Sequence, residues 1–233
     1  ESAKYSYSME TYEIENLDLD IGASDLTIKY EDTDEYVVTM ENGDEHICQV
    51  ENGTLKFKNS ESGKLFFGNS NRQKITIIIP RSAKLNAVDI ELGAGKMKAE
   101  YLEAEELFIK VGAGDVQVER LASQKDAQLT VGAGNMEVKS LITQKNVELK
   151  VEAGNMDVDI IQAGKADVTC EAGRFHSGAV NTLSDVQISC GAGSVYMNME
   201  QKEIKIIHMD IGQKLWLLFI PTQLGLSTAV AAW

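Results

Sequence analysis

The sequence is poor in the residues that cross-link a chain or interrupt its secondary structure. Its 233 residues include two Pro and three Cys, and three Cys are too few for the disulfide framework of a small secreted domain. The three His are His46, His176 and His208, and none has a His or Cys partner at the spacing of a metal site. We therefore assign no metal-ligating residues.

Positive charge is also scarce. The chain has 22 Lys and Arg against 36 Asp and Glu, a net charge of −14. Residues 1–51 alone contain 15 acidic residues against 2 Lys, which leaves −13 in this first part and the remainder nearly neutral. Without a basic stripe the chain cannot neutralise phosphate groups, so no nucleic-acid partner is predicted. We interpret the acidic first part as a solvated surface that discourages end-to-end pairing of edge strands.

The chain does contain a repeat. The tripeptide Gly-Ala-Gly or Glu-Ala-Gly occurs six times, beginning at residues 93, 112, 132, 152, 171 and 191. Apolar and polar residues alternate on both sides of each triplet, which is typical of two short strands and not of a helix. Since the triplets recur at nearly constant spacing, with a period of about 20 residues, they predict a solenoid.

This repeat predicts an all-β fold, a right-handed parallel β-helix with about 20 residues per rung. Equivalent strands run in the same direction, so successive rungs pair in parallel about 4.8 Å apart. Each central Ala is expected to face inward at a tight corner, where the flanking Gly supply positive φ or close backbone approach. On this expectation, Ala133→Leu overpacks the corner and destabilises the fold by about 1–3 kcal/mol.

We expect three regions along the chain. Residues 1–85 form a β-rich entry lobe that is continuous with the solenoid and contains its first rung, at residues 17–28. Residues 86–212 form the regular β-helix, and residues 213–233 form an apolar tail that departs from the repeat. Within the entry lobe, the strands are expected at residues 36–40, 46–50, 54–58 and 74–79, with turns at Asn42-Gly43 and Asn52-Gly53.

The tail has three possible interpretations. Residues 215–233 include both Trp of the chain and no charged residue. The three interpretations are a cap over the last rung, a membrane-associated segment, and an end foreign to the repeat. We favour the foreign end, which predicts self-association through 215–233 and an unchanged stability after truncation at Gly212. The chain begins at Glu1 without Met, and we expect an ectodomain from which a targeting segment was removed.

A few outward positions resemble chemical sites only weakly. Glu137 and Asp157 are expected to stack on adjacent rungs, as carboxylates do in polysaccharide-cleaving β-helices, but no third carboxylate joins their column. Asp115, Asn135 and Asn155 follow glycine triplets, as in a calcium-binding β-roll or a phosphate loop. The calcium repeat is shorter and the phosphate loop needs a helix, so we interpret these three as turn residues. We assign no catalytic or cofactor-binding residues.

The remaining candidates concern sulfur and an imidazole. Cys170 and Cys190 are expected on adjacent rungs of one interior column, either as buried free thiols, which we favour, or as a disulfide. Cys48 leaves an odd count. His176 is expected to pack beside Tyr196 on the outer surface.

The glycine-corner pattern, as in residues 107–118, 127–138 and 147–158, resembles the bacterial putative adhesin family of extracytoplasmic β-helical domains. The first rung and the strand ending at Pro80 are also similar to it. The resemblance implies a non-enzymatic, extracytoplasmic module without a cofactor, at the cell surface or held by a membrane anchor that is not in this chain. Its expected partner is cell-wall polymer or a surface protein. The alternative is a structural or sensory ectodomain of an envelope-stress protein, and a more distant one is an enzyme acting on polysaccharide.

Overall fold

The computed structural model describes residues 2–43, 45–59, 72–199, 207–211, 215–219 and 228–232, the last three ranges as backbone only. Within these ranges the secondary structure consists of strands without helices, as the sequence predicts. The strands are β1 (Ala3–Ser8), β2 (Asn16–Ile21), β3 (Asp25–Glu31), β4 (Glu35–Glu41), β5 (Ile47–Glu51), β6 (Thr54–Lys58), β7 (Lys74–Pro80), β8 (Ala87–Leu92), β9 (Lys96–Ala104), β10 (Glu106–Val111), β11 (Asp115–Ser123), β12 (Ala127–Val131), β13 (Asn135–Thr143), β14 (Asn146–Val151), β15 (Asn155–Ala163), β16 (Lys165–Cys170), β17 (Arg174–Thr182), β18 (Val186–Cys190), β19 (Ser194–Met199), β20 (Ile207–Ile211), β21 (Leu215–Phe219) and β22 (Thr228–Ala232).

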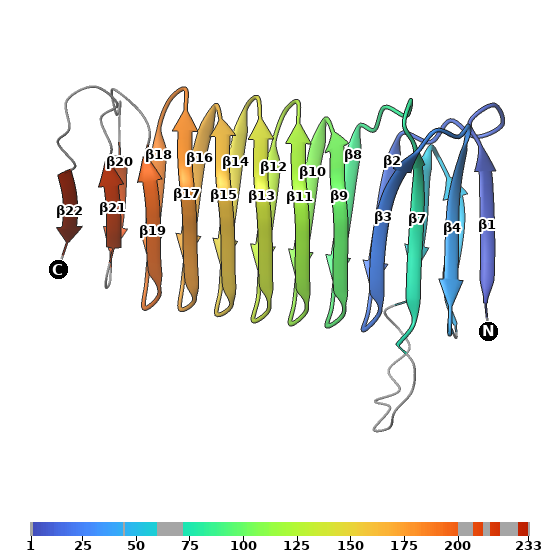
Figure 1. Cartoon of the computed structure of the whole chain (residues 1–233), viewed down its shortest axis with the longest axis horizontal. Coiled ribbons are helices and arrows are strands. Elements are labelled where there is room, and N and C mark those ends of the chain that lie inside the picture. The colour runs from blue at the N-terminus through green and yellow to red at the C-terminus, as the bar shows by residue number, and fades with distance from the viewer. Residues whose placement is uncertain are drawn as a thin grey trace.

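The strands form two sheets that face each other along a rod (Figure 1). Each regular rung gives one short strand to the sheet that runs from β20 to β5, and one longer strand to the sheet that runs from β1 to β22. Equivalent residues of successive rungs lie in register, for example Leu129 opposite Leu149 and Met136 opposite Met156. The predicted parallel β-solenoid, in which each rung follows the period of the glycine triplets, is confirmed.

The core is a set of apolar columns between the two sheets. Strand alternation directs every second side chain inward, and a column of identical positions stacks from rung to rung. Ser177 is an exception: it is fully buried in a column of Ala, Val and Met, and its hydroxyl makes no hydrogen bond within the described part of the chain. The four predicted columns are buried throughout: Ile90, Ile109, Leu129, Leu149, Val168 and Ile188; Leu92, Val111, Val131, Val151, Cys170 and Cys190; Met97, Val116, Met136, Met156, Phe175 and Val195; Ala99, Val118, Val138, Val158, Ser177 and Met197.

The glycine corners differ from the prediction in one respect. The central Ala of all six triplets is exposed, so the expectation that it faces inward is wrong. The last residue of the triplet points inward instead, and a β-carbon at Gly134 would overlap the carbonyl oxygen of Gly114 on the preceding rung. Within the described residues, Gly53 is the one glycine with positive φ, so the corners need glycine for close approach and not for φ.

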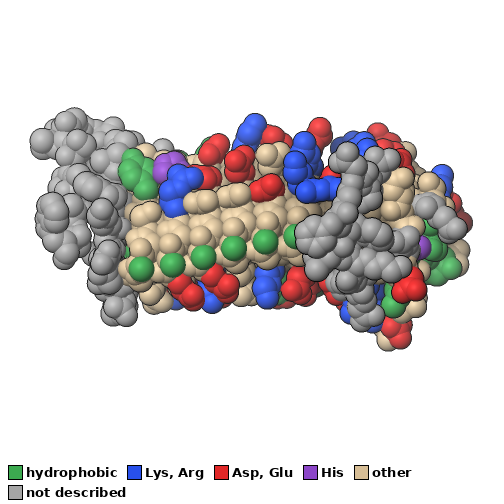
Figure 2. Space-filling model, turned by 90° about the horizontal axis from the view of Figure 1, so that it is seen from below, with side chains coloured by type: hydrophobic (Ala, Val, Ile, Leu, Met, Phe, Trp, Pro, Cys, Tyr) green, Lys and Arg blue, Asp and Glu red, His purple; other side chains and the backbone are tan. Residues whose placement is uncertain are grey.

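The exposed alanines form a straight, low row of hydrophobic side chains along one face of the rod (Figure 2). The backbone beneath this row is hydrogen-bonded between rungs, since the Ala133 amide donates to the Gly112 carbonyl oxygen at 2.7 Å. The first triplet position is less crowded, and Glu152 and Glu171 occupy it without difficulty. The restriction therefore falls on the last glycine of each triplet.

Within the entry lobe, the other strands lie against the first rung on the side away from the regular repeat. β6 and β7 form a rung of their own, parallel to β2 and β3, while β8 and β9 pair with the opposite edges of β2 and β3. The predicted strands at 36–40, 46–50, 54–58 and 74–79 correspond to β4, β5, β6 and β7. The turn residues Asn42 and Asn52 have φ of 57° and 50°, as their turn signals imply. Residues 60–71, between β6 and β7, lie outside the described residues.

Aromatic side chains close the N-terminal end of the solenoid. The Tyr5 hydroxyl lies 2.7 Å from Nε2 of His46, and the Tyr7 hydroxyl donates to the Cys48 carbonyl oxygen at 3.2 Å. The His46 ring also stacks on Phe57, which is buried. Because β1 and β5 belong to different sheets, these contacts join the two sheets across the open end of the core.

Backbone pairing continues beyond the regular repeat. β20 pairs in parallel with β18, β21 pairs in parallel with β19, and β22 then runs antiparallel to β21. The composition of the tail departs from the repeat, but its first strand keeps the direction and register of the sheet. Residues 212–214 and 220–227 lie outside the described residues, and the side chains of the tail are not described.

Candidate functional site

A groove opens where the entry lobe meets the regular rungs. β3 and β9 pair over only four residues, Asp25–Ile28 opposite Lys96–Ala99. Beyond Ile28, β3 stays with β7, whereas β9 follows β11 to Ala104. The two strands therefore separate, and the connection at 81–86 borders the space between them. We call this space of about 1290 Å³ the junction groove.

Two tyrosines at equivalent repeat positions shape the wall of the junction groove. Tyr30 on β3 and Tyr101 on β9 are half-buried, with ring centroids 5.3 Å apart at an angle of 58°. The Tyr30 hydroxyl accepts a hydrogen bond from the Glu103 amide at 3.2 Å, and the Tyr101 hydroxyl donates to the Glu103 carboxylate. The Arg120 guanidinium lies 5.7 Å from the centroid of the Tyr101 ring. These contacts hold both rings in place without a ligand.

Both phenols stay neutral at physiological pH. Burial raises the pKa of Tyr30 to about 12, although the hydrogen bond from the Glu103 amide works in the opposite direction. Burial and the hydrogen bond to Glu103 raise the pKa of Tyr101 further above its ordinary value. The Tyr30 oxygen serves as an acceptor for the Glu103 amide, and no described residue accepts its own hydroxyl proton. That proton is available to a ligand.

Charges around the junction groove are mixed and nearly balanced. Four basic residues and five acidic residues line it, so its net charge is about −1. Several of these charges are engaged elsewhere: Arg81 pairs with Asp32 at 3.0 Å, and Glu105 pairs with Lys125 at 2.9 Å. The charged lining residues are Lys29, Arg81, Lys84 and Lys98, and Glu31, Glu100, Glu103, Glu105 and Glu119.

Other polar groups in the junction groove have no partner within the described part of the chain. The side chains of Lys98 and Glu100 both lie on the outer face of β9, with the buried Ala99 between them in sequence. Gln117 lies beside Lys98 in register on β11. None of the three forms an ion pair or hydrogen bond among the described residues through its side chain. They present an ammonium, a carboxylate and an amide to the groove.

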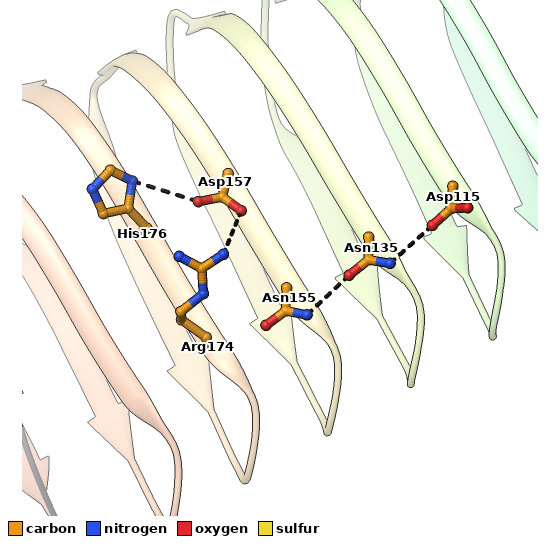
Figure 3. A network of polar contacts seen from close by, with 6 residues as sticks. All are labelled: Asp115, Asn135, Asn155, Asp157, Arg174 and His176. Atoms are coloured by element: carbon orange, nitrogen blue, oxygen red, sulfur yellow. Dashed lines mark hydrogen bonds and ion pairs between the residues drawn. The ribbon is translucent and has the colours of Figure 1, made fainter.

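A second polar arrangement follows the glycine corners (Figure 3). The Asn155 amide donates to the Asn135 side-chain oxygen, and the Asn135 amide donates to Asp115, both at 2.9 Å. This ladder joins three rungs through side chains that follow the glycine triplets. Each amide is used in the ladder, which agrees with the interpretation of these residues as turn residues. Their oxygens do not converge on one point (Figure 3).

The carboxylate of Asp157 is engaged by its neighbours. Glu137 and Asp157 lie opposite one another in register, as predicted. However, Asp157 forms an ion pair with Arg174 at 3.0 Å and lies 3.6 Å from Nδ1 of His176 (Figure 3). The His176 ring stacks on Tyr196 with centroids 4.9 Å apart, so the predicted packing of these two residues is confirmed. The column is a connected surface network and not an open pair of carboxylates.

Cys170 and Cys190 lie in register on β16 and β18, and both are buried free thiols. Burial raises the pKa of both, so they remain protonated and unreactive at neutral pH. Among the described residues, no group of three or more His, Cys, Asp or Glu side chains could hold a metal ion. His208 lies in β20, whose side chains are not described.

Like charges stack on the opposite sheet. Asp18 on β2 lies directly opposite Asp89 on β8. Partial desolvation and the carboxylates of Asp18 and Glu91 raise the pKa of Asp89 above its ordinary value of 3.8. Asp89 therefore binds a proton more readily in the folded chain than in the unfolded chain, and the stability gained from this protonation is lost as the pH rises through the folded pKa.

We expect Asp89→Asn to stabilise the fold at pH 7 by a few tenths of a kcal/mol, because it removes a like-charge pair. The gain should disappear below the ordinary Asp pKa of 3.8, where Asp89 is protonated in both states. Urea unfolding of both chains between pH 3 and pH 7 measures the effect. Asp159→Asn, at an exposed position on the other sheet, is the control, and a gain that does not change with pH would contradict the explanation.

Sequence reasoning missed the junction groove. The available signal was that Tyr30 and Tyr101 occupy the same position relative to their corners, on rungs that are adjacent in space. Their separation in sequence hid this relation. The predicted residues Asp115, Asn135, Asn155, Asp157 and His176 lie on the surface of the same sheet but outside the junction groove.

The stacked rungs, glycine corners and two parallel sheets define a parallel β-solenoid domain. A family model described as Toastrack DUF4097 matches residues 14–211, and the chain belongs to this family. The predicted resemblance to the putative adhesin family is thereby confirmed. Within the described ranges, no helix is long and apolar enough to cross a membrane.

Several solved structures share the fold. A putative adhesin from Bacteroides fragilis is 16% identical, with a TM-score of 0.61 and coverage of 94% of this chain and 97% of that chain. A putative lipid binding protein from Parabacteroides distasonis is 17% identical, with a TM-score of 0.58 and the same coverage. A putative adhesin from Parabacteroides merdae is 10% identical, with a TM-score of 0.56, and covers 95% and 97%. No curated protein matches the chain significantly.

Proposed function

We propose that this chain is a non-enzymatic binding module of the bacterial cell surface, similar in role to an adhesin. The observation that carries the proposal is the junction groove, a concave site that combines tyrosines held by hydrogen bonds with polar side chains that have no partner among the described residues. The names of the structural relatives, two putative adhesins and a putative lipid binding protein, support a binding role. Such names are an analogy of fold, so the function is argued from the site.

An extracytoplasmic location agrees with this proposal. The rod buries its core between two sheets and presents long polar faces, so that it can hold a binding site away from an anchor. The partner is expected to be a component of the envelope, either cell-wall polymer or a surface protein. The network around Asp157 uses its carboxylate in an ion pair, and we assign no catalytic residue.

The test is binding of the purified, fluorescently labelled chain to intact cells of the bacterium that encodes it and to envelopes isolated from those cells. We expect saturable binding that unlabelled chain competes away, without release of new reducing ends from envelope polysaccharide. Absence of saturable binding to either preparation would contradict the proposal and favour a structural or sensory role. Release of reducing ends would instead indicate an enzyme.

A further inference from the structure

We infer that the junction groove binds a neutral saccharide chain, an inference that rests on the proposed binding function and names the ligand class. The groove is bordered by hydrogen-bonding side chains, some positively and some negatively charged, and its lining carries a net charge of about −1. Such a lining suits a ligand with many hydroxyl groups and no charge of its own. A polyanion is disfavoured by the groove and by the net charge of −14 of the chain.

The geometry provides both types of hydrogen-bonding partner. Tyr30 offers a hydroxyl proton, since its oxygen already accepts from the Glu103 amide. Gln117 offers an amide donor and an acceptor, and Glu100 offers acceptors alone. Carboxylates and amides form hydrogen bonds with the hydroxyl groups of a sugar, and aromatic rings beside them pack against its apolar faces. The tyrosine contacts fix the two rings before the ligand arrives, which reduces the entropy lost on binding.

A peptide strand is a poorer occupant of the junction groove. An added strand needs a row of free backbone groups on a sheet edge. Where β9 leaves β3, the Glu103 amide already donates to Tyr30, and the Glu105 amide donates to the Leu85 carbonyl oxygen at 3.0 Å. On the other side, the Arg81 guanidinium donates to the Tyr30 carbonyl oxygen at 3.3 Å. These backbone groups are therefore not free to pair with an added strand, which favours recognition by side chains.

The test compares the binding of the full chain to cells of the bacterium that encodes it, before and after mild periodate oxidation, which cleaves sugars with vicinal hydroxyls. We expect oxidation to abolish saturable binding and protease treatment of the cells to preserve it. Tyr30→Phe and Gln117→Ala should each weaken binding to untreated cells about five- to tenfold, the usual effect of one lost hydrogen bond. Gln128→Ala on the opposite sheet is the matched control and should bind like the parent chain.

The outcomes separate this inference from the proposed function. Binding that survives periodate and is lost with protease would overturn the saccharide and indicate a protein partner. Binding competed by detergent micelles and unaffected by periodate would indicate a lipid. If both groove variants bind as tightly as the parent chain, the saccharide site in the junction groove is overturned, while the proposed binding function still stands. If Tyr30→Phe disturbs the fold by leaving the Glu103 amide unpaired, Gln117→Ala still decides, because its side chain has no partner among the described residues.

Discussion

Gly134→Ala is expected to destabilise the fold by about 3 kcal/mol or more, at the upper end of what overpacking usually costs. The added methyl group would overlap the backbone carbonyl oxygen of Gly114, which cannot move aside as a flexible side chain can. That oxygen also accepts the amide of Asn135 at 2.9 Å, so moving it would break the pairing between rungs. Urea unfolding and thermal melting followed by circular dichroism measure the effect.

The neighbouring residue supplies the control. Ala133 is exposed, so Ala133→Leu is now expected to change stability by no more than about 0.5 kcal/mol, as is usual for surface positions. This replaces the expectation that the same substitution overpacks the interior. A large loss from Ala133→Leu together with a small loss from Gly134→Ala would contradict the assignment of the two positions.

A chain that ends at Ile211 is expected to melt at a lower temperature and to associate with itself. Removing the tail deletes β21, whose five residues pair with β19. β19 would then become an edge strand, and edge strands with free backbone groups pair with other chains. Val195, Met197 and Met199 on β19 are fully buried in the intact chain and would lie at the open end of the core.

The matched control is a chain that ends at Phe219, which loses β22 but keeps β21 on β19. Light scattering and thermal melting of the two shortened chains and the whole chain distinguish the roles of the strands. We propose on this ground that residues 215–219 cap the solenoid. A chain ending at Ile211 that stays monomeric and melts like the whole chain would instead support an end foreign to the repeat.

Much of the fold could be predicted from the sequence because the repeat carries the information locally. Period-two alternation around each triplet defines the interior columns, and the turn signals at Asn42-Gly43 and Asn52-Gly53 place the strands of the entry lobe. The corner was assigned incorrectly because the central Ala and the last Gly are equally invariant. Glu152 and Glu171 mark the first position as outward, and a corner that admits no β-carbon inside requires the last position to be glycine.

The candidate site could not be predicted in the same way. The junction groove exists because β3 continues along β7 while β9 continues along β11, and this choice of partners involves strands that lie far apart in the sequence. A repeat describes how rungs are alike, whereas the groove arises where one rung differs from the next. The surface residues that do follow the repeat, such as Asn135 and Asn155, are used between rungs.

The threading of the entry lobe has a kinetic consequence. The first rung is synthesised early, yet the strands that pair with it come much later in the sequence, since Asn16 pairs with Thr54 on one side and with Ala87 on the other. Closing such long loops precedes any gain from strand pairing, so this step should limit the rate of folding. Each later rung needs only its predecessor and can add in order as the chain emerges. Destabilising substitutions around residues 16–104 should therefore slow folding, whereas those near β16 and β18 should mainly accelerate unfolding.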